Sequence, residues 1–415
     1  MKVLYFHQHF SIPQGPGAIR SYEMSKRLIN RGHQVVMVCG SFIGNSTGLE
    51  GDFIKGRRRG YVEGIEVIEF DLAYSNADGF LSRTWTFLKY AFHSLIIVFT
   101  EKYDLIFATS TPLTAGIPGI FAKIFKKKPF VFEVRDLWPE LPKAMGVITN
   151  PFIISLMSAL EWLSYHSANH LVALSPGIAE GIKKRGIKSE HITLIPNGCD
   201  IDIFEETSKS WRPETINDKD FLAIFAGTHG IANGLNSVID AAAELNIRRR
   251  KDIKILLIGS GQLKSSLIDR VNKEKLENVV FHDPVNKKLL SGLISSSNIG
   301  LQTLTNVPAF YYGTSPNKFF DYIAGGLPVI NNYPGWIADI IKETNSGYVV
   351  PPEKPEVFAD ILEEAADNCG DLIIKSKNAK KLAINRFNRK NQSLNWVMVL
   401  EKTYNKVNDE SYLNE

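Results

Sequence analysis

Short apolar runs alternate with helix-length segments along the whole of this 415-residue chain. In the first half, each run has the length of a buried strand, and the segments between the runs, such as 20–30 and 152–166, have helical periodicity. The strands expected there are 3–6, 35–38, 105–108, 130–134 and 171–174. This alternation predicts βα units around a parallel sheet.

A second succession of the same kind follows, with expected strands at 221–225, 253–258, 279–281, 299–301 and 328–330. The polar segment 205–220 between the two successions has no apolar period, so we expect it to be a linker. The predicted fold is therefore α/β, with a first Rossmann-like domain over 1–204 and a second over 221–390. No internal sequence repeat is found.

Residues from about 391 to 408 carry apolar side chains at helical spacing, including Trp396, Leu400 and Tyr404. We expect this helix to cross back onto the first domain. The alternative is that it packs only against its own domain.

Composition narrows the class of protein. An apolar content of 44% with 22% charged residues is that of a globular protein, and 415 residues exceed one ordinary core. The net charge of +4 is spread along the chain, which argues against a nucleic-acid binder. Cys39, Cys199 and Cys369 lie far apart without a CxxC pair, so we expect neither a disulfide framework nor a zinc site. A reducing cytosol fits this pattern best.

No targeting or membrane-spanning segment is expected. The first residues enter a strand at once and show no signal-peptide pattern. The apolar run 87–99 is shorter than the ~20 residues that a bilayer span needs.

The most informative motif is the segment 315–330, which should open a helix and run through Gly325-Gly326 into a strand. Pro316 suits a first helical position, where the free amides of Asn317, Lys318 and the next residue would face an anion. Asp321 lies one turn after Lys318, so a carboxylate could bind sugar hydroxyls while the lysine meets phosphate. This spacing fits a nucleotide clamp. The alternative is an amphipathic helix with a solvated ion pair.

Glycine-bearing loops follow the first strand of each expected domain. In the first, Gly15 and Gly17 would let backbone amides approach an oxyanion before the helix that contains Arg20. The spacing is not GxGxxG, and Cys39 stands near the place where a dinucleotide fold needs an acid, so hydride transfer is a poor fit. A tight turn without a ligand is the alternative.

The second loop contains Gly227, Thr228, His229, Gly230 and Asn233. A diphosphate could lie on it, with Thr228 and His229 as hydrogen-bonding side chains and Asn233 as a helix N-cap. His229 could equally be an ordinary loop histidine.

Further turns, which include Gly259 and Val285, follow two later strands and could hold a base. In the first half, a polar cluster ends the strand 130–134. Arg135 could neutralise developing charge, while Asp136 or Glu140 could position an acceptor hydroxyl or act as a base. The alternative is an internal ion-pair network.

Taken together, these motifs resemble the family 4 retaining glycosyltransferases, and the L-fucosamine transferase-like branch in particular. The resemblance rests on motifs in the same order along nearly the whole chain: 15–20 with 22–23 and 31–35, 133–140, 195–198, 227–230 and 316–322. It implies a GT-B fold, two Rossmann-like domains facing across a cleft, with the nucleotide held mainly by the second domain and the acceptor by the first. It also implies that no bound metal is needed.

Two positions depart from the family pattern. The wider family carries two glutamates eight positions apart, but here the second is Asp321 and the first is Gly313, so the usual donor-sugar contact is missing. Many members have a histidine where Arg135 stands, which leaves His229 as the candidate catalytic histidine.

The resemblance implies transfer of a sugar, with retention of its anomeric configuration, from a UDP-sugar to a glycan or a polyprenyl-diphosphate-linked saccharide. For the L-fucosamine transferase-like branch, the expected sugar is an N-acetylated amino sugar. The expected setting is bacterial O-antigen or capsule synthesis in the cytoplasm, at the inner face of the membrane. In this assignment Arg135, Asp136, His229 and Lys318 are catalytic, Arg20 and Glu140 bind acceptor, and the other loop residues, with Gly17, bind donor. A UDP-sugar epimerase and a non-catalytic nucleotide-sugar-binding module remain as alternatives.

Membrane association would use the basic segment 55–59, the apolar run 85–99 and Lys126-Lys127-Lys128, on an anionic surface. Each has a plain alternative, because a sheet-covering helix and solvated turns have the same composition.

Overall fold

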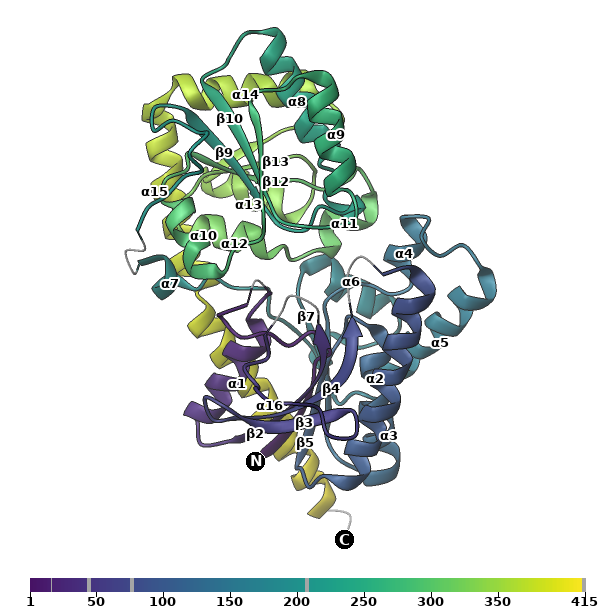
Figure 1. The fold of residues 1–415 in the computed structure, drawn as a ribbon. Coiled ribbons are helices and arrows are strands. Elements are labelled where there is room, and N and C mark those ends of the chain that lie inside the picture. The colour runs from purple at the N-terminus through teal and green to yellow at the C-terminus, as the bar shows by residue number, and fades with distance from the viewer. Residues whose placement is uncertain (16, 43–45, 75–77, 206–208, 413–415) are drawn as a thin grey trace. The chain divides into compact units, whose positions relative to one another are not determined.

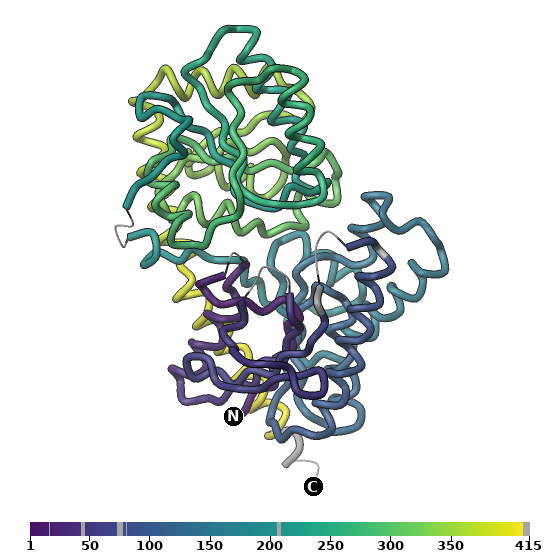
Figure 2. Tube along the Cα trace, viewed as in Figure 1, coloured from purple at the N-terminus to yellow at the C-terminus, as the bar shows by residue number. Residues whose placement is uncertain are grey.

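The structure, a computed structural model, describes residues 1–15, 17–42, 46–74, 78–205 and 209–412. The chain divides into two compact units (Figures 1 and 2). The first unit comprises Met1–Pro196, Tyr312–Ser315 and Lys390–Glu415, and the second comprises Asn197–Tyr311 and Pro316–Arg389. Both are α/β units built on mainly parallel sheets, as the sequence pattern predicts.

The first unit contains an eight-stranded sheet in the order β3-β4-β2-β1-β5-β6-β7-β8. Its strands are β1 (Lys2–Phe6), β2 (Gln34–Phe42), β3 (Arg57–Val62), β4 (Ile65–Tyr74), β5 (Leu105–Thr109), β6 (Phe130–Val134), β7 (His170–Ala173) and β8 (Ile192–Leu194). All neighbouring strands are parallel except the β3–β4 hairpin. The chain order reverses between β1 and β5, so the carboxyl ends of these strands form the natural ligand position.

The helices of this unit are α1 (Arg20–Asn30), α2 (Phe80–Thr100), α3 (Ile117–Lys126), α4 (Glu140–Ala144), α5 (Pro151–Ser167) and α6 (Pro176–Lys184), with 3-10 turns at Leu113–Gly116 and Ser189–His191. Local sequence explains where several begin. At α5, the Asn150 side chain accepts hydrogen bonds from the amides of Phe152 and Ile153, and Pro151 occupies the first turn. Within the described residues, no helix is long and apolar enough to cross a bilayer.

The second unit contains a six-stranded parallel sheet in the order β11-β10-β9-β12-β13-β14. Its strands are β9 (Phe221–Ala226), β10 (Ile253–Ile258), β11 (Val279–His282), β12 (Ile299–Gln302), β13 (Val329–Asn331) and β14 (Gly347–Val349). The order reverses between β9 and β12. The loops that follow these two strands are therefore placed together at one edge of the sheet.

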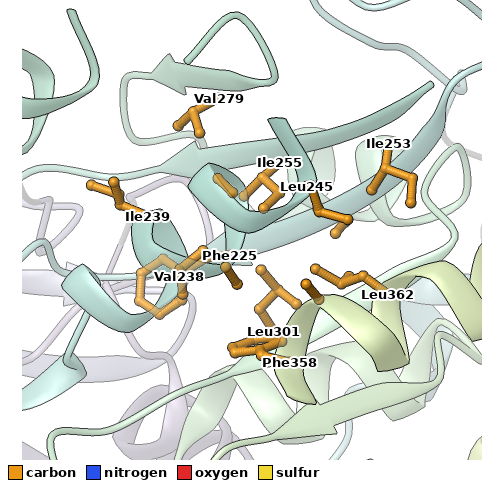
Figure 3. Close-up of a cluster of buried hydrophobic side chains, with 14 of the residues drawn as sticks. Phe225, Val238, Ile239, Leu245, Ile253, Ile255, Val279, Leu301, Phe358 and Leu362 are labelled. Atoms are coloured by element: carbon orange, nitrogen blue, oxygen red, sulfur yellow. The ribbon is translucent and has the colours of Figure 1, made fainter. Parts of the chain in front are cut away.

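Helices cover this sheet and bury its apolar side chains. They are α7 (Ile201–Glu205), α8 (Asn236–Ile247), α9 (Lys264–Glu274), α10 (Lys287–Ile294), α11 (Pro308–Gly313), α12 (Asn317–Ala324), α13 (Trp336–Thr344), α14 (Pro355–Asp367) and α15 (Cys369–Phe387), with a 3-10 turn at Ile231–Asn233. One core layer joins Phe225, Ile255 and Leu301 of the sheet to Val238 of α8 and Leu362 of α14 (Figure 3).

The segment expected to be a linker belongs to the second unit, which begins at Asn197. Trp211 Nε1 donates to the carbonyl oxygen of Leu289 at 2.8 Å, and Ile216 is buried in the core of this unit. Trp211 and Ile216 thus attach residues 209–220 to the second unit, whereas residues 206–208 of the expected linker lie outside the described residues.

The last helix, α16 (Arg389–Tyr412), lies almost wholly in the first unit. The buried Trp396 ring lies 4.7 Å from that of Phe107 and 5.7 Å from that of Tyr5, centroid to centroid. The end of the chain therefore contributes to the core of the first unit.

Candidate functional site

Lys318, in the first turn of α12, reaches the glycine loop that follows β9. Its Nζ donates to Asn233 Oδ1 at 2.6 Å and lies 4.6 Å from the centroid of the Phe225 ring. Burial lowers the pKa of this amine to about 7. The amine thus lies in a poorly solvated position, where an incoming anion would stabilise its charged form.

Gly227 makes room for this lysine, because a Cβ at Gly227 would lie 3.2 Å from Lys318 Cε. Not every amide of the loop is available to a ligand. The amides of Gly227 and His229 donate to the carbonyls of Ile258 and Ser260, both at 2.9 Å. Among the amides of residues 227–230, those of Thr228 and Gly230 therefore remain as candidates to donate hydrogen bonds to a phosphate.

Gly259 and Gly261 are required by contact between two loops. Gly259 has a φ of 146°, and a Cβ there would lie 1.9 Å from the carbonyl oxygen of Gly227. Gly261 has a φ of 155°, and its Cβ would lie 2.6 Å from the carbonyl oxygen of His229. The loop after β10 thus packs directly against the loop after β9. A side chain at Gly259 or Gly261 would push the two loops apart.

His229 occupies the interior of the second unit. Its side chain is fully buried, with its ring centroid 6.2 Å from that of Phe225 and 6.0 Å from that of Phe281. Burial, with a smaller contribution from the Lys264 ammonium, lowers the pKa of the imidazole to about 4. A buried, neutral imidazole suits loop packing better than the proton transfer expected of a catalytic histidine.

Two capping expectations differ in the structure. Asn233 does not cap α8, which begins at Asn236; its side chain instead donates to the carbonyl of Thr228 at 2.7 Å and accepts from Lys318. Pro316 is the N-cap of α12 and Asn317 its first residue. The amide of Phe319 donates to the Pro316 carbonyl, so the amides of Asn317 and Lys318 are the ones in the first turn that helix geometry leaves without a partner. The expected base-binding residue Val285 packs against the core of the second unit.

Asp321 points toward α10 and not toward the glycine loop. Its Oδ1 lies 2.8 Å from Lys287 Nζ, which also donates to Asp200 Oδ2 at 2.5 Å. Arg389 completes the group, bonding Asp200 through both Nε and Nη2. Two carboxylates and two cations thus form a buried neutral network. Burial raises the pKa of Asp321 despite the opposing charge of Lys287.

In the first unit, polar side chains gather where β1, β5 and β6 end. Asp136, after β6, accepts a hydrogen bond from Thr111 Oγ1 at 3.0 Å, and burial raises the pKa of its carboxyl. Arg135 Nη1 lies 3.2 Å from His7 Nε2. Since β1, β5 and β6 are consecutive in the sheet, the carboxyl ends of neighbouring strands bring these residues together.

His7 and Gln8 are missing from the sequence-based candidates. Both are buried, and within the described residues His7 Nδ1 and both polar atoms of Gln8 lack a hydrogen-bond partner. Burial, together with the charge of Arg135, holds the pKa of His7 well below its usual range. Unpaired buried polar groups are rare in folded proteins, so this pair is a candidate for a functional role. In the sequence, only the position of His7 and Gln8 directly after the first strand could have identified them as candidate site residues.

Arg20 is not accessible to an acceptor. Its guanidinium is buried, pairs with Glu133 Oε2 at 2.8 Å, and donates to the carbonyls of Ile195 and Pro196 at 3.0 and 2.8 Å. The ion-pair alternative considered for the cluster at the end of strand 130–134 thus applies to Glu133, whose partner is Arg20. By contrast Glu140, the first residue of α4, is exposed, and Gly17 lies just before α1.

No group of three or more His, Cys, Asp or Glu side chains in the described ranges is arranged to hold a metal ion.

Both units match protein families. Residues 17–198 match the family described as "Glycosyl transferase 4-like domain". Residues 207–385 match the family described as "Glycosyl transferases group 1". The two matches account for most of the chain and meet close to the boundary between the units.

Two relatives share part of the sequence. The chain is 26% identical over 211 residues to a D-inositol 3-phosphate glycosyltransferase from an Arthrobacter species. This match covers 48% of the chain and 48% of that relative, so it spans about half the length of each protein. It is 24% identical over 318 residues, 72% of this chain and 75% of the relative, to a protein called probable glycosyltransferase WbjE from Pseudomonas aeruginosa.

A solved structure shares the fold. The crystal structure of HepE from Anabaena in complex with UDP covers 97% of this chain and 100% of its own, with a TM-score of 0.65 and 16% identity.

Proposed function

We propose that this chain, a glycosyltransferase of the GT-B fold, moves a sugar from a UDP-sugar to an acceptor hydroxyl with retention of anomeric configuration. The observation that carries the proposal is the position of Lys318, half-buried at the start of α12 and held against the glycine loop after β9. The presence of UDP in HepE, a protein of the same fold, supports the choice of donor.

The chemical demand of such a transfer is to stabilise the departing diphosphate. In this proposal Lys318 supplies a full positive charge, and the amides of Thr228, Gly230, Asn317 and Lys318 supply hydrogen bonds. These groups together replace a divalent cation. Asp321, whose Oδ1 pairs with Lys287, offers its second carboxylate oxygen to a ribose hydroxyl.

In the first unit we assign the acceptor to the carboxyl ends of β1, β5 and β6. Asp136 positions the acceptor hydroxyl, with Thr111 fixing the carboxylate. Arg135, aligned by His7, neutralises negative charge. The departing phosphate oxygen then takes the acceptor proton, so His229 is not needed as a base.

The finer assignments follow the resemblance. The donor sugar is an N-acetylated amino sugar, the acceptor is a glycan or a polyprenyl-diphosphate-linked saccharide, and the product belongs to a bacterial O-antigen or capsule. A Cβ at Gly313 would meet nothing within 4 Å, so open space lies where the wider family has a glutamate. The expected location is the cytoplasmic face of the membrane.

A panel of UDP-sugars, incubated with and without lipid-diphosphate saccharides, tests the activity. Acceptor-dependent release of UDP is expected. Isomerised donor without an acceptor would show an epimerase, and donor binding without turnover a binding module.

Replacing the lysine isolates its role. We expect Lys318→Ala to lower turnover on the order of a hundredfold, because the leaving group loses its charge compensation. Lys254→Ala, which removes a lysine whose Nζ meets only the Glu277 carbonyl within the described ranges, is the control. Unchanged turnover in Lys318→Ala would remove the proposed role.

A further inference from the structure

Helix α2 is apolar on two faces. Its inner face packs on the sheet through buried residues such as Tyr90, Ile97 and Val98, and Tyr90 donates to the carbonyl of Val38 at 2.7 Å. Its outer face carries a second apolar row that is exposed: Leu81, Trp85, Leu88, Phe92, Ile96 and Phe99. These residues recur every three or four positions, so they form one stripe along the helix. Packing on the sheet explains why the inner face of α2 is apolar. It does not explain why the exposed outer face is apolar as well.

The neighbouring helices extend this apolar surface. Helix α3 packs against both α2 and α5 (Figure 1). Its last turn exposes Ile124 and Phe125, and the Phe125 ring centroid lies 6.3 Å from that of Phe99 on α2. Helix α5 adds the exposed side chains of Phe152, Leu156, Trp162 and Leu163. An unpartnered surface of this kind marks an interaction site.

The charges on these helices have one sign. Neither α2 nor α3 contains Asp or Glu, and the one acid of α5, Glu161, is buried and pairs with Arg185 at 2.5 Å. Lysines lie beside the exposed rings: Lys89 Nζ is 5.6 Å from the Trp85 centroid, and Lys126 Nζ is 5.5 Å from that of Phe99.

The basic segment 55–59 belongs elsewhere. Arg58 pairs with Glu69 at 2.9 Å, and Arg59 pairs with Glu66 and with Glu101, the latter at 2.6 Å. These arginines are part of the β3–β4 hairpin and its ion pairs, so they are not a free cationic patch. The expected contribution of Arg58 and Arg59 to membrane binding is therefore set aside.

We propose that the outer face of α2, with the C-terminal turn of α3 and the exposed side of α5, docks onto an anionic lipid bilayer. Aromatic and aliphatic side chains enter the interface while the adjacent lysines reach the phosphate layer. A lipid surface fits better than a protein partner, because the face combines a long unbroken apolar row with cations and presents no exposed acid from these three helices. The inference extends the proposed function, since it would bring the first unit to a lipid-linked acceptor.

Vesicle co-sedimentation tests the surface without donor or acceptor. We expect the full-length protein to pellet with equimolar phosphatidylcholine and phosphatidylglycerol vesicles, more weakly with phosphatidylcholine alone, and less as salt is raised. The triple variant Trp85→Gln, Phe92→Gln, Phe99→Gln should bind at least about tenfold more weakly, because it removes three inserted side chains. Lys126→Gln with Lys127→Gln should weaken binding on the order of tenfold and only to anionic vesicles.

The matched control is Ile247→Gln with Ile373→Gln, which removes exposed apolar side chains from α8 and α15 of the second unit. It should pellet like the unchanged protein. Failure of the unchanged protein to pellet at low salt, or equal loss in the control, would overturn the proposal. UDP release from a soluble acceptor, measured on the same variants, separates the two hypotheses: vesicle binding without transfer contradicts the activity, and transfer without vesicle binding contradicts the docking face.

Discussion

We expect a single amine, that of Lys318, to make donor binding depend on pH. Its pKa is lowered to about 7 by burial, so in the free protein it is largely neutral above that pH. A bound diphosphate stabilises the charged form, and binding above pH 7 must therefore take up a proton. We expect affinity for a UDP-sugar to be constant below about pH 7 and to weaken by up to about tenfold per pH unit above it.

Calorimetry in buffers of different ionisation enthalpy measures the proton uptake. Arginine keeps its charge at every pH in this range, so Lys318→Arg should remove the dependence on pH even if it binds more weakly. A pH-dependence that persists in this variant would assign the effect to another group.

Thr111 controls the protonation of Asp136. Its hydroxyl donates to the carboxylate, which favours the charged form and opposes the rise in pKa that burial causes. Thr111→Val removes this hydrogen bond without changing the size of the side chain, so the pKa of Asp136 should rise. The acid limb of the pH–rate profile should then move to higher pH. Thr111→Ser keeps the hydroxyl and should leave the limb in place, whereas an identical shift in both variants would point to backbone disturbance.

At the scale of elements, one buried ion network in the second unit joins α10 and α12 to Asp200, just before α7, and to Arg389, the first residue of α16. Asp200 precedes α7, and burial alone would raise its pKa, but Arg389 and Lys287 together hold it at about 2. We expect Asp200→Asn to destabilise the protein by about 3–5 kcal/mol, because the buried Arg389 loses its carboxylate partner and Lys287 keeps only Asp321. Denaturant unfolding measures this loss.

The exposed pair Glu343–Arg386 offers a contrast, since Arg386→Ala should cost less than about 1 kcal/mol. Acid titration gives a second measurement. A carboxylate with a lowered pKa stabilises the fold fully above its unfolded pKa of ~3.9, and this stabilisation is lost as pH falls from about 4 to about 2. The Asn variant should lack this part of the acid transition.

The elements predictable from sequence were those with strong local patterns. All ten expected strands occur, because each contains a short apolar run, and most of these runs are buried on both faces of a sheet. The β3–β4 hairpin was missed because β3 begins with three consecutive arginines and so has no apolar run, and the pairing of two of these arginines with Glu66 and Glu69 is known only from the fold. β8 and β14, with three residues each, are too short for a recognisable period.

The candidate site divides in the same way. Lys318 and the glycine loop were found because their motifs are local. The ion network was not, since Lys287 and Arg389 lie 87 and 189 residues from Asp200. Likewise, sequence spacing placed Lys318 and Asp321 on one helical face. In the structure Lys318 contacts Asn233 after β9, whereas Asp321 contacts Lys287 of α10.

For the whole molecule, the last helix determines whether the first unit is stable. Trp396 is completely buried against Phe107 and Tyr5. We expect Trp396→Ala to cost about 3–5 kcal/mol through the cavity that it leaves. Calorimetric melting should show the loss in the first unit. Met398→Ala, at a position 45% exposed on the same helix, should change the melting temperature little, and an equal effect would contradict the role assigned to the packing of Trp396.

The placement of α16 also has a consequence for biosynthesis. Residues 197–311 and 316–389 form a unit enclosed, along the chain, by the pieces of another. As the polypeptide leaves the ribosome, the enclosed second unit is complete once its last strands and α15 have emerged. The eight-stranded sheet of the first unit is synthesised earlier, but its core is complete only after Trp396 has emerged. The domain translated second is therefore the first that can finish folding.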